Sequence, residues 1–406
     1  MKKNIWQRLG PGFITGAADD DPSGIGTYSQ TGAQFGYSQL WLALFSFPFM
    51  TVVQEMCGRI GIVTGRGLSG VVRRHYVRPV LYVAVGLLMI ANTINIGADL
   101  GAMAAAGQLL LGIPFVAWLL GLTALTLLLE IFVSYPRYAK FLKFLTLSLF
   151  AYVVTVFVVK QDWGAVAWST IVPSFSWHKE YILNIVAVLG TTISPYLFFW
   201  QASEEVEEAQ ELKKRNFLAE IKDMRIDTMV GMFFSNLIMF FIIVTTASTL
   251  GAHGIVQVDT AATAAEALRP LAGNFAFVLF AIGIIGVGLL AVPILAGSAS
   301  YAVVESLDLP GGLSKKWYEA KIFYGIIIVA TLVGVLINFL HIPPFTMLYY
   351  TAVMNGLVAP PLLLLILLIS NNKKIMGKHT NGKWSNLFGI LIMLLMATAG
   401  VLIFVL

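Results

Sequence analysis

Residues 19–24 read Asp-Asp-Asp-Pro-Ser-Gly and interrupt an apolar segment, 10–35, that is otherwise long enough to cross a membrane. A charge near the bilayer centre costs at least ~2.5–3.5 kcal/mol on insertion scales. Pro22 removes a backbone N–H donor, and Gly24 lets the chain leave helical geometry. Together they predict a broken helix whose freed carbonyls and carboxylate face a cavity inside the protein. Such a break is typical of a cation site in a transporter.

The composition indicates a protein that lies in a lipid bilayer and crosses it many times. Of the 406 residues, 58% are hydrophobic and 12% are charged, whereas soluble domains carry roughly 25% charged residues. The single cysteine, Cys57, excludes an intramolecular disulfide and a Cys-rich metal site. The net charge of +5 is spread thinly between apolar runs, so we expect no nucleic-acid partner. Residues 1–8 are too short and polar for a cleaved signal peptide.

Apolar runs predict eleven transmembrane helices in an all-α membrane protein. They lie at about 10–35, 40–63, 80–111, 115–134, 144–161, 183–205, 225–250, 272–304, 322–340, 344–370 and 386–406. With a cytoplasmic N-terminus, every lysine and arginine except Lys160, Lys179 and Arg269 lies on the cytoplasmic side. We therefore expect a multi-pass protein of the plasma membrane, such as a bacterial inner membrane.

The helix count permits a single transmembrane domain, 1–406, with two inverted repeats of five helices. The repeats are expected at about 10–161 and 183–370, with an extra helix at about 386–406. Helices 1 and 6 then correspond, and helix 6 contains a second break at Gly190-Thr191-Thr192-Ile193-Ser194-Pro195-Tyr196. Paired breaks at matching positions indicate a binding site near the membrane midplane.

The polar stretch 203–223 is expected to continue helix 6 into the cytoplasm. Two roles stay open for it. It is either a solvated connector or an acidic vestibule in which Glu204, Glu205 and Glu208 gather cations.

Three segments carry a resemblance to the NRAMP divalent-metal transporters. Gly10-Pro11-Gly12-Phe13 followed by Asp21-Pro22-Ser23-Gly24 resembles the first helix of that family, whose signature is Asp-Pro-Gly-Asn. The segment 189–196 is similar to its second signature, which ends in Met-Pro-His, and Leu111-Gly112-Ile113-Pro114-Phe115 is also NRAMP-like. The resemblance covers most of the chain and implies a LeuT-like fold with broken helices 1 and 6.

The resemblance also implies where a metal ion binds. The family's aspartate is retained as Asp21, its asparagine position is Gly24, and its carbonyl position falls on Thr191. Its methionine position is Ser194, and its histidine position is Tyr196. We therefore take Asp21, Gly24, Thr191 and Ser194 as the candidate metal site.

The departures from the family pattern favour a hard cation. Serine at position 194 removes the soft thioether, and oxygen ligands suit magnesium, calcium or manganese. Glycine at position 24 removes a ligand and is expected to enlarge the cavity. Magnesium dehydrates reluctantly and keeps several waters. The pattern resembles the NRAMP-related magnesium transporters, a divergent branch, and implies partly hydrated Mg²⁺, with Mn²⁺ as a further substrate.

A second group of residues is expected beside the ion or along its path, and several have an alternative role. Ser194 could instead bond back to its own helical turn, and Asp21 could simply cap a helix. Asp99 falls on a glutamate position of the family and either lies near the site or pairs with Asn92 or Asn95. The group expected beside the ion or along its path comprises Asp19, Asp20, Thr192, Tyr196, Asp99 and Asn95.

The proton relay of the family looks incomplete in this chain. Tyrosine, with an ordinary pKa near 10, does not titrate at physiological pH as the family's histidine does. A further acidic position falls on Ile96. We therefore expect uptake by alternating access without proton coupling, driven by the membrane potential. Two other intramembrane acids, Glu55 and Glu130, are expected to pair with Arg59 or Arg137.

Three other functions remain as alternatives. The first is a proton-coupled Mn²⁺ or Fe²⁺ importer, and the second is an organic-solute carrier of the same architecture. The third is an intramembrane aspartyl hydrolase, for which Asp21 and Asp99 form the plausible pair. We expect no enzyme activity, no cofactor apart from the transported ion, and a monomer.

Overall fold

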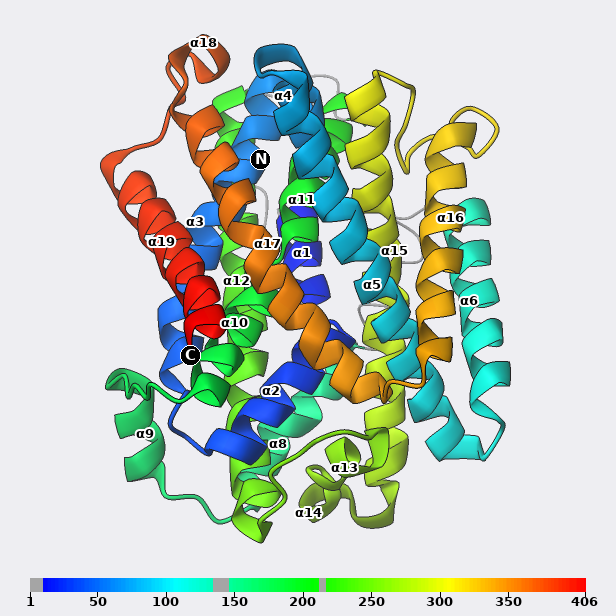
Figure 1. The fold of residues 1–406 in the computed structure, drawn as a ribbon, viewed down its shortest axis with the longest axis vertical. Coiled ribbons are helices and arrows are strands. Elements are labelled where there is room, and N and C mark those ends of the chain that lie inside the picture. The colour runs from blue at the N-terminus through cyan, green and yellow to red at the C-terminus, as the bar shows by residue number, and fades with distance from the viewer. Residues whose placement is uncertain (1–9, 134–145, 212–216) are drawn as a thin grey trace.

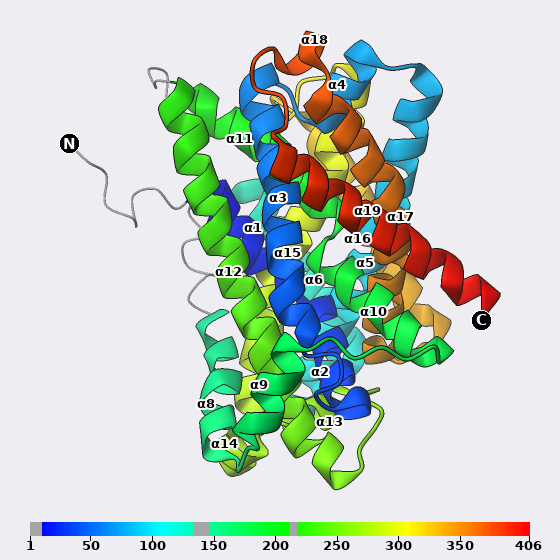
Figure 2. The same ribbon diagram turned by 90° about the vertical axis from the view of Figure 1, so that its left-hand side faces the viewer.

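The computed structural model describes residues 10–133, 146–211 and 217–406, and every regular element in these ranges is a helix. Figures 1 and 2 show long helices packed side by side into one bundle, with short helices at both ends. The long unbroken helices are α3 (Trp41–Thr64), α5 (Arg78–Leu111), α6 (Phe115–Phe132), α12 (Phe217–Thr249), α15 (Ala276–Leu307), α16 (Lys321–Ile337), α17 (Pro344–Asn371) and α19 (Lys383–Val405).

Helix α8 (Phe150–Val158) continues the 3₁₀ turn η2 (Thr146–Leu149) within the predicted segment 144–161. Other short helices occupy the connections, which the apolar runs did not predict. At one end of the bundle lie α4 (Leu68–His75) and α18 (Lys373–Met376). At the other end lie α9 (Trp163–Ile171), α13 (Ala261–Glu266) and α14 (Arg269–Ala272). The 3₁₀ turns η3 (Gly251–His253), η4 (Gly273–Phe275) and η5 (Asn338–Leu340) complete the connections.

Two helices are broken, as the sequence predicts. The first consists of α1 (Pro11–Asp19) and α2 (Pro22–Phe35), and the second of α10 (Lys179–Thr192) and α11 (Pro195–Glu211). A proline is the first residue of α2 and of α11. Proline is favoured there because a backbone N–H in the first turn of a helix has no intrahelical acceptor, so its absence costs no hydrogen bond. Helix α11 runs on to Glu211, as expected for the first part of the connector, whereas residues 217–223, which were expected to belong to the same helix, begin α12.

Each of the eleven predicted segments contains helix. Within the described residues, eight helices are long and apolar enough to span a membrane. The other three segments hold the broken pair α1–α2, the helix α3 and the shorter helix α8. The predicted ends at 134 and 144 lie outside the described residues, as do the basic residues at positions 2, 3, 8, 137, 140, 143 and 213–215.

Glycines bring pairs of helices into backbone contact around the breaks. A Cβ at Gly16 of α1 would collide with the backbone of Gly231 on α12, and a Cβ at Gly231 would collide with the backbone around Gly12. Likewise, a Cβ at Gly190 of α10 would collide with Gly356 on α17. In a bilayer such small residues allow close packing, which drives helix association. Figure 2 shows α1 lying along α12.

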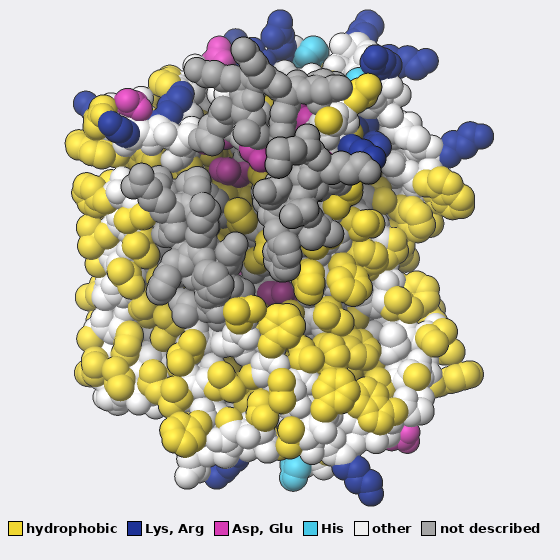
Figure 3. All heavy atoms as spheres, turned by 180° about the vertical axis from the view of Figure 1, so that it is seen from behind, with side chains coloured by type: hydrophobic (Ala, Val, Ile, Leu, Met, Phe, Trp, Pro, Cys, Tyr) yellow, Lys and Arg dark blue, Asp and Glu magenta, His cyan; other side chains and the backbone are white. Residues whose placement is uncertain are grey.

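Charged side chains gather at the ends of the molecule. Figure 3 shows the lysines and arginines concentrated at the end that carries α4 and α18, with few at the opposite end and a broad hydrophobic band between. This separation agrees with the positive-inside pattern. The orientation of the N-terminus stays a prediction.

Candidate functional site

Asp21 lies in the gap of the first broken helix and caps its second half. Its backbone is extended (φ −63°, ψ 172°), and its Oδ1 accepts a 2.7 Å hydrogen bond from the N–H of Gly24. The capping role that the sequence left open is therefore real. Because the cap uses only Oδ1, the second oxygen, Oδ2, faces the interior of the bundle, where a cation can approach it.

Two donors hold Oδ2 of Asp21 loosely. The side-chain amide of Asn95 on α5 lies 3.3 Å away, and the hydroxyl of Tyr196 on α11 lies 3.5 Å away. Both distances are long for hydrogen bonds. The two broken helices and α5 therefore meet at one carboxylate oxygen, which brings Asp21, Asn95 and Tyr196 together.

The second break supplies hydroxyls and carbonyls opposite Asp21. The Oγ1 of Thr191 lies 3.4 Å from the Oγ of Ser23 on α2. The hydroxyl of Ser194 donates to the carbonyls of Gly190 (2.7 Å) and Thr191 (2.9 Å), so it bonds back to its own turn. Its oxygen lone pairs remain free to accept from water or to bind a cation.

Thr192 plays a structural part in this arrangement. Its hydroxyl donates to the carbonyl of Val188 at 2.8 Å. Ser23, in contrast, contacts Thr191 of the second break and was not among the predicted site residues. Its place in the motif Asp21-Pro22-Ser23-Gly24 is the sequence feature that points to it.

The space beside Gly24 is filled, which differs from the enlarged cavity that the sequence suggested. A Cβ at this position would lie 3.0 Å from the carbonyl oxygen of Asp19, 3.3 Å from the ring of Tyr28 and 3.5 Å from the hydroxyl of Thr191. The missing side chain is replaced by the turning backbone of the break. Gly24 thus leaves room for the backbone of Asp19 and the ring of Tyr28, while Thr191 of the second break would lie at ordinary contact distance.

Asp99 on α5 does not form the asparagine pair that the sequence left open. It is fully buried one helical turn beyond Asn95, which donates to Asp21, and neither of its carboxylate oxygens has a hydrogen-bond partner among the described residues. The amide of Asn92 donates to the carbonyl of Leu295 at 2.9 Å, and that of Asn95 donates to Asp21. The predicted pairing with Asn92 or Asn95 is therefore wrong, because both amides are used elsewhere.

Asp19 and Asp20 turn toward α12. The hydroxyl of Ser235 lies 2.5 Å from Oδ2 of Asp19 and 3.4 Å from Oδ1 of Asp20. Ser235 could not be found from the sequence, because α12 carries neither a break nor a motif. Within the described residues no three His, Cys, Asp or Glu side chains form a metal-binding group.

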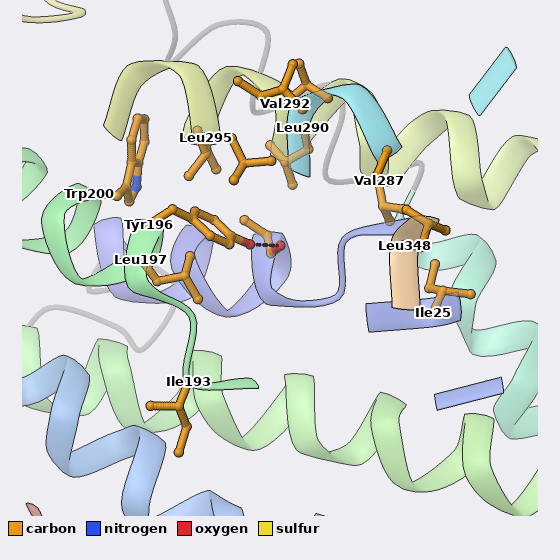
Figure 4. Close-up of a cluster of buried hydrophobic side chains, with 14 of the residues drawn as sticks. Ile25, Ile193, Tyr196, Leu197, Trp200, Val287, Leu290, Val292, Leu295 and Leu348 are labelled. Carbon is orange, nitrogen blue, oxygen red and sulfur yellow. Dashed lines mark hydrogen bonds between the residues drawn. The ribbon is translucent and has the colours of Figure 1, made fainter. Parts of the chain in front are cut away.

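The site is closed to solvent in this conformation. Asp21, Thr191, Ser194 and Tyr196 each expose no more than 2% of their surface. Figure 4 shows the hydrophobic side chains that surround the two breaks, and a dashed line marks the bond from the hydroxyl of Tyr196 to the carbonyl of Ala18. Burial in an apolar surrounding strengthens any electrostatic interaction between a carboxylate and a cation.

The acids away from the breaks mostly have structural partners. Glu55 pairs with Arg59 at 3.0 Å, as predicted, and also with Arg225 at 2.8 Å. Glu130 is buried, and neither of its oxygens has a hydrogen-bond partner among the described residues. Of the two predicted partners of Glu130, Arg59 pairs with Glu55, and Arg137 lies outside the described residues.

The acids of the connector are tied to neighbouring side chains, which favours the structural role. Glu205 accepts a 2.8 Å bond from Gln201, and Tyr301 on α15 donates to Glu204 and Glu207. Such bonds fix α11 against α15 at this end of the bundle.

Proteins with similar sequences are named as metal transporters. The divalent metal cation transporter MntH of Mesorhizobium japonicum is 27% identical over 300 residues, which cover 71% of this chain and 64% of that protein. MntH of Deinococcus radiodurans is 27% identical over 299 residues, which cover 71% of this chain and 66% of that protein. The match thus spans somewhat less than two thirds of the length of these curated relatives.

Solved structures share the fold across nearly the whole chain. The manganese transporter of Eremococcus coleocola, in complex with an aromatic bis-isothiourea substituted compound, aligns with a TM-score of 0.79 at 18% identity, covering 98% of this chain and 87% of that one. Mhp1, a nucleobase-cation-symport-1 family transporter, aligns at 0.61 and 12% identity, covering 97% and 92%. The chain therefore has the expected LeuT fold.

The family model described as natural resistance-associated macrophage protein-like matches residues 12–406. This range contains both broken helices and every candidate site residue. The chain belongs to the natural resistance-associated macrophage protein-like (Nramp) family.

Proposed function

We propose that this protein carries divalent metal cations, principally partly hydrated Mg²⁺, across a membrane by alternating access. The observations that carry the proposal are one weakly held carboxylate oxygen at the first break and one buried carboxylate without hydrogen bonds, among the described residues, on the neighbouring helix α5. Oδ2 of Asp21 is held only by long hydrogen bonds, and both oxygens of Asp99 have no partner. Buried carboxylate oxygens without a partner are costly, and a bound cation removes that cost.

The choice of magnesium rests on the chemistry of the groups around Asp21. The hydroxyls of Thr191 and Ser194 and the side-chain amide of Asn95 offer oxygen atoms, which suit hard cations. One aspartate between the breaks, with a second carboxylate nearby, also suits an ion that keeps part of its water shell.

We propose that transport is not coupled to protons. Tyr196 occupies the family's histidine position, and its hydroxyl is engaged by the carbonyl of Ala18. A divalent cation moving inward gains about 4.6 kcal/mol per 100 mV of membrane potential, twice the value for a single charge. Accumulation therefore needs no second driving ion.

A proton-coupled manganese importer is the second candidate, because the curated relatives are named for divalent metal transport and a solved structure with this fold is named for manganese transport. The names of these proteins are not those of enzymes, and the aspartyl hydrolase receives no support from them.

Uptake into proteoliposomes tests the proposal. The reconstituted protein is given Mg²⁺ or Mn²⁺ outside, with a metal-sensitive dye and a pH-sensitive dye inside. We expect Mg²⁺ entry that depends on the membrane potential without stoichiometric acidification. Manganese entry without a magnesium signal would contradict the substrate, and stoichiometric acidification would contradict uncoupled transport.

A further inference from the structure

Two carboxylates beside the Asp21 site converge on a single hydroxyl. Ser235 of α12 lies 2.5 Å from Asp19 and 3.4 Å from Asp20, and all three side chains are buried, with 4% exposure at most. The other oxygen of Asp19, Oδ1, has no hydrogen-bond partner. A structural role for this pair alone would leave that buried oxygen unsatisfied, which is unfavourable.

A second, independent group points to the same place. Tyr28 on α2 is fully buried, and its hydroxyl has no hydrogen-bond partner. Its ring packs beside the backbone of Asp19: a Cβ at Gly24 would lie 3.3 Å from the ring of Tyr28 and 3.0 Å from the carbonyl oxygen of Asp19. A phenolic oxygen can accept as well as donate, so it can serve as a cation ligand.

The balance of charge also favours more than one cation. Asp19, Asp20, Asp21 and Asp99 are all buried around the first break, and none of them has a lysine or arginine within salt-bridge distance in the described part of the chain. One divalent ion compensates two of these carboxylates. Helix α1 also ends here, and a helix C-terminus attracts positive charge.

We propose that a second divalent cation binds between Asp19 and Asp20, with the hydroxyls of Ser235 and Tyr28 as further oxygen ligands. It lies beside the ion at Asp21, toward α12, and the two ions together compensate the four carboxylates. Carboxylate and hydroxyl oxygens match the preference of Mg²⁺ and Mn²⁺. This inference deepens the proposed function and rests on it.

Binding stoichiometry tests the second site. Purified protein in detergent is titrated with Mg²⁺ in a calorimeter, and with Mn²⁺ under electron paramagnetic resonance, where two neighbouring ions show dipolar broadening. We expect two ions per chain. The variant Asp19→Asn/Asp20→Asn is expected to bind one ion without broadening, and Asp308→Asn, an exposed carboxylate, serves as the matched control with two.

One ion in the unmodified protein, or two in Asp19→Asn/Asp20→Asn, would overturn the proposal. Size-exclusion profiles and melting temperatures establish that each variant is folded. If the double variant does not fold, Ser235→Ala and Tyr28→Phe keep both carboxylates, and each is expected to weaken the second ion several-fold. Unchanged affinity in both variants overturns the second site.

The outcome for the second site is separable from that for transport. Asp21→Asn is expected to lose the first ion and uptake into liposomes, while the second ion stays bound. Absence of uptake by the unmodified protein would contradict the proposed function, whereas the ion count alone decides the second site.

Discussion

Tyr196 donates a 2.8 Å hydrogen bond to the carbonyl of Ala18 and thereby links the two broken helices. Ala18 lies in the last turn of α1, where carbonyls lack intrahelical partners. The same hydroxyl lies 3.5 Å from Asp21. Tyr196 thus joins the backbones of the two broken helices, and its hydroxyl proton is donated to the carbonyl of Ala18.

Asp21→Ala is expected to abolish Mg²⁺ uptake, because it removes the carboxylate at which the two breaks and α5 meet. It also removes the cap of α2, which costs about 1 kcal/mol of stability. Uptake by proteoliposomes measures the first effect, and thermal unfolding in detergent measures the second. Asp308→Ala, at an exposed surface ion pair, is the control and should transport normally. Retained uptake in Asp21→Ala would exclude this aspartate as a ligand.

Tyr196→Phe is expected to leave uptake largely intact and to lower the melting temperature, because the loss of one buried hydrogen bond costs about 1 kcal/mol. Internal acidification should be absent from both proteins. An acidification signal that the phenylalanine variant loses would show that this tyrosine takes part in proton movement.

Asp99→Asn is expected to raise the KM for Mg²⁺ by about tenfold, or about 1.4 kcal/mol, with little change in stability, since its oxygens have no hydrogen bonds to lose. Asn92→Ala is the contrasting variant, since it removes the 2.9 Å bond to Leu295 and should act on stability first. An unchanged KM in Asp99→Asn would place this carboxylate outside the ion's surroundings.

Ser194→Met is expected to shift selectivity toward Mn²⁺ by about tenfold in competition assays, about 1.4 kcal/mol, because it adds a soft ligand. Combining it with Gly24→Asn should strengthen the shift at a cost in stability, since a Cβ there lies 3.0 Å from the carbonyl of Asp19. Unchanged selectivity in both variants would count against this reading of position 194.

Gly16→Ala is expected to destabilise the protein by about 1–3 kcal/mol, the usual cost of overpacking, because its Cβ would collide with the backbone of Gly231. Gly86→Ala on α5 is the control, since its Cβ would meet no atom within 4 Å. Melting temperatures of the two variants in detergent should therefore differ. Equal stability would show that α1 and α12 can separate without loss.

The sequence by itself determined the membrane-spanning plan, the two breaks and the position of Asp21 in the first of them. These features depend on local chemistry. Twenty apolar residues span a bilayer, and a proline next to carboxylate or hydroxyl side chains favours a break in the helix. Pro48, Pro293 and Pro360 lie inside continuous helices and lack such a motif. The breaks at Pro22 and Pro195 can therefore be predicted without knowledge of any contact between helices.

Only the tertiary structure decided which side chains meet at those breaks. Ser235 reaches Asp19 from α12, more than two hundred residues along the chain, and Asn92 turns to Leu295 instead of Asp99. The room at Gly24 is taken by the backbone of Asp19, which no spacing in the sequence reveals. Such contacts depend on how helices rotate and pack against one another, and helices that are apolar on most faces give no periodic signal for that rotation.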